Sequence, residues 1–221
     1  MMTITENILL GKLVDTYPLT SKVLHKHGLD FCCGGRKSLA EACEASGIDL
    51  DVILSELKPS LTPSPKRAWS DATTEELVAH ILDEYHAPLP EFLSHLEMLV
   101  SRVVDVHGNK DPDRLLSLKD AIFGLSQELR GHMMKEERIL FPWILSEQQP
   151  PPAAPIEVML SEHEDAGAFL QDIAALTDNF SAPSGACRTW RTLYSGLQHL
   201  DEELRVHIHL ENNILFPRAL R

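Results

Sequence analysis

The chain contains the stretch His132-Met-Met-Lys-Glu136-Glu-Arg-Ile-Leu-Phe-Pro, and 75 residues later it reads His207-Ile-His-Leu-Glu211-Asn-Asn-Ile-Leu-Phe-Pro. The two copies share the frame His-x-x-x-Glu-x-x-Ile-Leu-Phe-Pro. Residues four apart lie one above the other on the same face of an α-helix. Each copy therefore offers an imidazole nitrogen and a carboxylate to one point in space. Two such pairs, facing each other across a helical bundle, predict a metal site.

The apolar residues that precede each copy indicate which way the pairs point. They recur at alternating steps of three and four, and the next steps arrive at the histidine and the glutamate of the copy. Both pairs are therefore expected on the core-facing stripe of their helix. Since a buried carboxylate without a partner is costly, such groups are paired or bind metal. The stripe residues are Leu118, Ile122, Leu125 and Leu129 before the first copy, and Leu193, Leu197, Leu200 and Leu204 before the second.

Two more histidines, His86 and His163, also continue apolar stripes of helical period. The separation from His86 to His132 is 46 residues, and that from His163 to His207 is 44 residues. This near-equal spacing indicates an internal duplication of a helical hairpin. Each hairpin carries one histidine and then one His-x-x-x-Glu pair.

The ligand types narrow the choice of metal. Four imidazoles and two carboxylates are too many for one zinc ion, which is tetrahedral in structural sites. They are too rich in nitrogen for calcium or magnesium. They suit two transition-metal ions, each bound by two histidines and both bridged by Glu136 and Glu211. Iron or manganese fits this mixed set and keeps open coordination positions.

Composition limits the class of protein. At 221 residues the chain is long enough for one sizeable domain and a small companion. Its formal net charge of −13 argues against nucleic acid or an anionic membrane as a partner. Neither a signal peptide nor an apolar run of about 20 residues is seen, so no membrane span is expected. The four cysteines show no disulfide-framework spacing, which predicts a reduced, cytoplasmic protein.

The chain is expected to divide into a small helical domain at residues 1–58, a Pro/Ser-rich linker at 59–68 and a helical bundle at 69–221. Short connections predict an up-down-up-down arrangement of four bundle helices. Pro88 and Pro90 predict a bend close to His86, because proline removes a backbone hydrogen bond from a helix. The predicted helices cover residues 71–106, 111–146, 155–179 and 184–217.

The segment Asp30-Phe-Cys32-Cys33-Gly-Gly-Arg36-Lys37 lies between two predicted helices of the small domain. The two cations and the N-terminus of the following helix are expected to favour thiolate over thiol. Adjacent cysteines cannot easily both point into one core, so we predict that Cys32 and Cys33 have a chemical role. The alternative is that they only fill a small core.

The remaining histidines fall off the apolar stripes. His107, near the end of its helix, is either a loop residue or a residue that approaches the site, and we favour the loop. Six others are expected to be solvated: His25, His27, His80, His95, His199 and His209.

The six ligand candidates resemble those of a hemerythrin-like di-iron domain. The preceding segment Asp-Phe-Cys-Cys-Gly-Gly resembles the N-terminal domain of the iron–sulfur cluster repair family, the "repair of iron centres" proteins. The two motifs occur in the family's order and together cover nearly the whole chain. The resemblance implies an all-α protein, a hemerythrin-like four-helix bundle preceded by a small helical domain. It also implies two non-haem iron ions per chain, joined by oxo and carboxylate bridges, in a cytoplasmic homodimer.

The function implied by the resemblance is the repair of iron–sulfur clusters damaged by nitric oxide or peroxide, with damaged iron–sulfur proteins as clients. Glu128 and Glu162 match carboxylates that line a polar channel to the metals in the family. The same six ligands also serve two other classes of function, a sensor or scavenger that binds nitric oxide or O₂ and an oxidoreductase that reduces nitric oxide. Stoichiometric binding would favour the sensor, turnover with a reductant the enzyme, and iron transfer to a client the repair protein.

Overall fold

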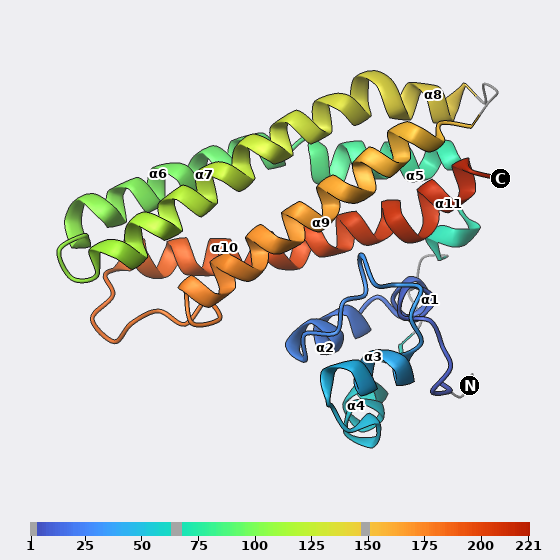
Figure 1. Cartoon of the computed structure of the whole chain (residues 1–221), viewed down its shortest axis with the longest axis horizontal. Helices are drawn as coiled ribbons and strands as arrows, with labels where there is room; N and C mark the ends of the chain where they lie inside the picture. The colour runs from blue at the N-terminus through green and yellow to red at the C-terminus, as the bar shows by residue number, and fades with distance from the viewer. Residues whose placement is uncertain (1–3, 63–67, 147–150) are drawn as a thin grey trace. The chain divides into compact units, whose positions relative to one another are not determined.

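The computed structural model describes residues 4–62, 68–146 and 151–221 of the chain (Figure 1). By its contacts the chain forms two compact units, one made of residues 1–79 together with 205–221 and the other of residues 80–204. Part of the predicted linker, residues 63–67, lies outside the described residues. The division at 59–68 therefore stays a prediction.

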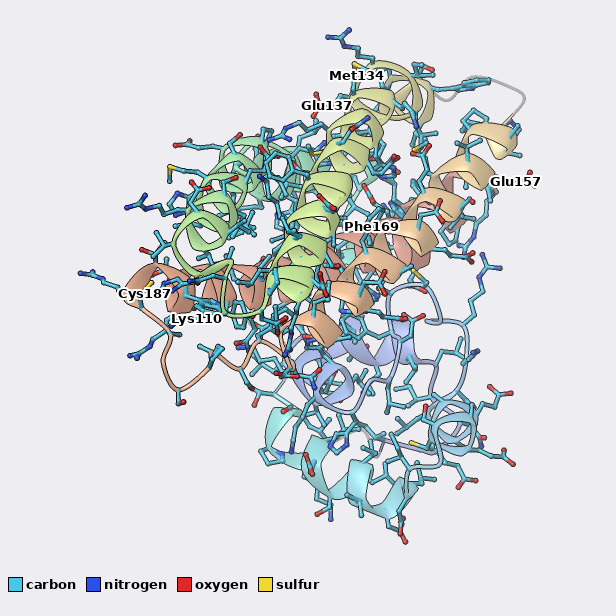
Figure 2. The ribbon with its side chains drawn as sticks, turned by 60° about the vertical axis from the view of Figure 1, so that its left-hand side comes forward. Lys110, Met134, Glu137, Glu157, Phe169 and Cys187 are labelled. Atoms are coloured by element: carbon cyan, nitrogen blue, oxygen red, sulfur yellow. The ribbon has the colours of Figure 1, made fainter. Side chains whose placement is uncertain are left out.

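The unit of residues 80–204 is built from long amphipathic helices, as the period of the apolar residues predicts. Two glycines let neighbouring helices approach closely. A Cβ at Gly124 would lie 2.9 Å from the ring of Phe169, which Figure 2 labels on α9, and one at Gly196 would lie 2.8 Å from Leu96. The helices are α6 (Leu89–His107), α7 (Pro112–Lys135), α9 (Ala153–Leu176) and α10 (Arg188–Leu210), whose last residues belong to the other unit. The all-α, hemerythrin-like bundle is confirmed.

The other unit begins with short helices whose ends follow local sequence rules. Ser38 and Glu41 form the capping box at the start of a helix, and Gly28 has a φ of 66° just after the end of another. The helices are α1 (Leu10–Thr16), α2 (Thr20–Lys26), α3 (Leu39–Ser46), α4 (Leu50–Leu57) and α5 (Thr74–Ile81), whose last two residues belong to the unit of residues 80–204. The 3₁₀ turns are η1 (Lys58–Ser60) and η2 (Trp69–Asp71).

The C-terminal residues 205–221 belong to this same unit. Arg218 donates hydrogen bonds of 2.9 Å to the carbonyl of Ala72 and 3.2 Å to that of Trp69. One of these carbonyls begins η2 and the other follows it, so the guanidinium fastens the segment before α5 to the end of the chain. None of the described helices combines the length and the apolar character needed to cross a membrane.

Among the described residues, three helical stretches widen into a π-helical turn. These turns are η3 (Leu82–His86), η4 (Glu136–Leu140) and η5 (Glu211–Leu215), the last two followed by the short helices α8 (Phe141–Leu145) and α11 (Phe216–Ala219). Each turn ends two residues before a proline, Pro88, Pro142 or Pro217. Because proline cannot donate to the i−4 carbonyl and clashes with it, a wider turn accommodates it. The turn η3 lies where the bend beside His86 is predicted.

Candidate metal centre

Four of the six predicted ligands come together inside the unit of residues 80–204. His86 lies at the end of η3, His132 near the end of α7, Glu136 at the start of η4 and His163 on α9. All four side chains are buried, as the stripe predicted. Glu136 Oε2 lies 3.4 Å from His86 Nε2 and 3.3 Å from His132 Nε2, and the Nε2 atoms of His132 and His163 are 2.9 Å apart. The four side chains therefore present their ligand atoms to one small region.

The chemistry of this cluster fits a bound cation. Glu136 has no exposed surface, and neither of its oxygens has a hydrogen-bond partner within the described parts of the chain. A buried carboxylate in this condition is expensive unless a cation is present. Nitrogen and carboxylate ligands together match transition metals such as iron or manganese. The buried histidine and glutamate side chains thus suit metal binding.

Two carboxylates orient the histidines from the outer side. Nδ1 of His86 donates to Glu137 Oε1 at 3.0 Å, and Nδ1 of His132 donates to Glu162 Oε2 at 2.9 Å. A proton held on Nδ1 leaves the lone pair on Nε2, and in both rings Nε2 is the atom close to Glu136. The carboxylates therefore select the tautomer that can bind a metal.

Glu162 is itself held by a cation. Partial burial works to raise its pKa, but hydrogen bonds from Lys135 and His132 outweigh burial and lower the pKa below its usual value. Glu162 therefore stays ionised as an acceptor for His132. Glu128, the other carboxylate expected beside the metals, is exposed on α7. Its role in a channel stays a prediction.

The other two predicted ligands lie in the second copy of the repeated frame, within the unit that holds the C-terminal residues. His207 and Glu211 are buried, with His207 Nε2 3.1 Å from Glu211 Oε1. The i, i+4 spacing thus places both groups on one buried face of the helix, as predicted.

Glu137 was missed by the sequence reasoning, because its side chain is off the apolar stripe and 47% exposed. Figure 2 shows it on the turn that follows α7. Its sequence signal is weak: it is the residue after a ligand, and only the fold brings it to His86, 51 residues away.

The expectations for the other histidines were partly wrong. His95 and His199 are exposed as expected, His25, His27 and His80 are half-buried, and His209 is buried. The ring of His209 lies against that of Phe31, and burial lowers its pKa to about 4. The apolar stripe of α10 alone does not reveal this, because residues of the small helical region cover His209 from outside the helix. His107 is the last residue of α6 rather than a loop residue, with Nε2 3.2 Å from Cys187 Sγ.

The cysteine loop is organised by Asp30. Its Oδ1 accepts hydrogen bonds from the backbone of Cys32 at 3.1 Å and of Cys33 at 2.9 Å, and its Oδ2 accepts one from Gly34. Cys32 is buried and Cys33 is half-buried, so the two side chains do point into different surroundings.

The expected preference for thiolate is wrong for Cys32. Its hydrogen bond with Cys33 raises the pKa of the Cys32 thiol well above the usual value, and burial and the charge of Asp30 act in the same direction. The nearby cation that opposes them is Arg205, and it does not prevail. Arg36 and Lys37 follow the cysteines in sequence, but proximity in sequence did not decide the charge at the sulfur.

Comparison with known proteins supports both parts of the chain. The hemerythrin HHE cation binding domain model matches residues 77–219, and the ScdA_N domain model, described as a domain of unknown function, matches residues 6–60. The iron-sulfur cluster repair protein YtfE of Cronobacter sakazakii is 43% identical over 211 residues, covering 96% of this chain and 95% of the relative. The YtfE protein of Dickeya chrysanthemi is 42% identical over 217 residues, covering 96% of both chains. That of Escherichia coli is 40% identical over 211 residues, with the same coverage.

Proposed function

Because this chain belongs to the family of the iron-sulfur cluster repair proteins YtfE, we propose that it restores iron–sulfur clusters damaged by nitric oxide or peroxide, with iron–sulfur proteins as its clients. The observation that carries this proposal is the buried cluster of His86, His132, Glu136 and His163. It combines an orphaned carboxylate with histidines whose Nε2 atoms are directed inward. This arrangement would hold the iron that cluster repair requires.

The full ligand set of the proposal is His86, His132, Glu136, His163, His207 and Glu211, holding two non-haem iron ions bridged by the two glutamates. Two facts support it. The frame His-x-x-x-Glu occurs twice and is buried twice, and the hemerythrin match spans residues 77–219, which include all six side chains. When bound, iron supplies a redox-active centre with open positions for a small ligand such as nitric oxide or O₂.

The chain's own residues prepare this site. Glu137 and Glu162 fix the tautomers of His86 and His132. Phe141, which is buried, lies with its ring centroid 5.6 Å from that of His86 and keeps water from this side of the imidazole. Glu162 is half-buried and also paired with Lys135, so it stays an ionised acceptor that keeps the proton on His132 Nδ1.

The setting of the proposal is a cytoplasmic homodimer that binds neither nucleic acid nor membrane. Each of the four cysteines carries a thiol rather than a disulfide, which suits a reducing compartment. The net charge of −13 repels phosphate backbones and anionic lipid. The dimer rests on the family resemblance.

The test is metal analysis with Mössbauer spectroscopy on full-length protein purified without added metal, followed by a repair assay. The assay supplies the protein to an iron–sulfur hydro-lyase inactivated by nitric oxide and measures its recovered activity. We expect two irons per chain and recovery that depends on the iron-loaded protein. One zinc per chain, or recovery equal to that with a matched amount of ferrous salt, would contradict the proposal.

A further inference from the structure

Asn212 and Asn213, in the second copy of the repeated frame, contact the cysteine loop. The amide of Asn213 donates to the carbonyl of Cys32 at 2.9 Å and to that of Phe31 at 3.2 Å. The amide of Asn212 lies 3.4 Å from the carbonyl of Cys32 and 3.8 Å from Cys33 Sγ, both within hydrogen-bonding range. All these residues belong to the same compact unit. The helix that carries the predicted ligand Glu211 therefore holds the cysteine loop through the two residues that follow this ligand.

The space around the Asn213 side chain leaves little room beyond its amide. A Cβ added at Gly35 would lie 2.2 Å from Asn213 Oδ1, and one added at Gly11 would lie 2.9 Å from the same atom. The Asn213 amide nitrogen is also 3.2 Å from His209 Nδ1. An amide with these contacts cannot move aside without losing hydrogen bonds to the loop. Gly11 and Gly35 are thus the small residues that this contact requires.

The two sulfurs of the loop differ in burial and in their other hydrogen-bond partners. Cys32 Sγ is buried and donates to Asp30 Oδ1 at 3.2 Å, a contact that needs the thiol proton. Cys33 Sγ is half-buried and accepts from the Asn212 amide, a contact that either a thiol or a thiolate can make. The thiolate is the form of cysteine that binds metal or attacks an electrophile. Both accessibility and hydrogen bonding therefore favour reaction at Cys33.

We propose that Cys33 is the thiol that reacts first with iron or an electrophile and that Cys32 does not react in this step. Asn212 and Asn213 are positioning residues that maintain this difference. The inference rests on the proposed function, since it names the thiol through which the cysteine loop would handle a client's iron. On binding a ferrous ion, Cys33 forms one sulfur–iron bond and releases its proton to water. No electron is exchanged in this step.

The test is alkylation of the full-length, iron-loaded protein by iodoacetamide, with each cysteine followed separately by peptide mass spectrometry. Alkylation forms a sulfur–carbon bond, releases iodide and leaves the thiol proton in the buffer. We expect Cys33 to be labelled more than about tenfold faster than Cys32, because Cys32 is buried and its thiol proton is held by Asp30. Equal rates, or faster labelling of Cys32, would overturn the inference.

The positioning role is tested by Asn213→Ala, with Arg138→Ala at the matching position of the first copy as its control. Loss of the amide should free the loop, expose Cys32 and bring the two rates together, while Arg138→Ala should keep the parent's ratio. Gly35→Ala, which displaces the Asn213 side chain, should reproduce the effect of Asn213→Ala. An unchanged ratio in both loop variants contradicts a positioning role.

The labelling experiment and the repair assay test different claims, and each can fail without the other. A parent protein that shows the labelling contrast without repairing a cluster contradicts only the proposed function. One that repairs clusters but labels both cysteines alike contradicts only the present inference. Within a repairing protein, Cys33→Ser should lower repair more than Cys32→Ser.

Discussion

The two copies of the frame His-x-x-x-Glu-x-x-Ile-Leu-Phe-Pro have the same local structure but different neighbours. In each, the glutamate begins a π-helical turn that ends two residues before a proline. The copies differ at the two positions after the glutamate. Glu137 of the first copy supports His86, whereas Asn212 and Asn213 of the second hold the cysteine loop. Both copies therefore share the predicted ligands and the π-helical turn. The two positions after the glutamate make different contacts in each copy.

The choice of residue type at these positions follows from their surroundings. Glu137 is exposed and accepts a hydrogen bond from an imidazole, a task for which a carboxylate is suited. Asn212 is buried and faces a carbonyl and a sulfur, which need a donor without a charge. A glutamate there would place an ionised group in a buried site with acceptors around it. A similar contrast is found two residues after each histidine, where Met134, labelled in Figure 2, is exposed and His209 is buried.

The largest effect is expected from removing either glutamate that the copies share. Glu136→Leu and Glu211→Leu should each lose bound iron while the helices remain folded, because an apolar residue of similar size replaces a buried charge. Elemental analysis and far-ultraviolet circular dichroism measure the two quantities. Full iron content in both variants would show that neither glutamate is a bridging ligand.

The next effect separates the tasks of the copies. Glu137→Ala should weaken iron binding about 10- to 100-fold, because His86 loses the acceptor that fixes its tautomer. Asn212→Ala, at the matching position, should leave iron affinity unchanged, since its amide contacts Cys32 and Cys33 of the cysteine loop. Competition with a chelator of known affinity gives both values. Similar losses in the two variants would break the distinction between the copies.

A third variant tests the close packing of Gly35 against the Asn213 side chain by the free energy of unfolding. Gly35→Ala should destabilise the protein by about 1–3 kcal/mol, since its new Cβ forces the Asn213 amide from its hydrogen bonds. Gly167→Ala, whose Cβ would meet nothing within 4 Å, should stabilise α9 by about 0.5–1 kcal/mol. Urea titration of both variants and the parent measures this. If Gly35→Ala left the free energy of unfolding unchanged, the Asn213 amide could move without losing its hydrogen bonds.

The smallest effect is expected at the variable position that is exposed in the first copy. Arg138→Asn makes this copy resemble the second, yet the free energy of unfolding should change by less than about 0.5 kcal/mol and iron content should stay the same. The same titrations and metal analyses apply. A large change would reveal a contact of Arg138 that the comparison of the copies overlooks.

Much of the fold and of the candidate site was predictable from the sequence. Apolar residues at steps of three and four placed the helices and put His132, Glu136, His207 and Glu211 on buried faces, because periodicity records which side of a helix is covered. The capping box at Ser38 likewise depends only on residues within one turn. Such information is local, since it depends only on residues within a turn or two.

Tertiary structure alone decided which groups meet across the chain. Glu137 reaches His86 over 51 residues, and Asn213 reaches Cys32 over 181, and neither pairing leaves a periodic signal. For the same reason the sequence misjudged His209 and the charge preference of Cys32, whose surroundings come from distant segments. Helical periodicity specifies that a face is buried, but the identity of the covering groups sets hydrogen bonding and pKa. Those groups are brought together only by the folded chain.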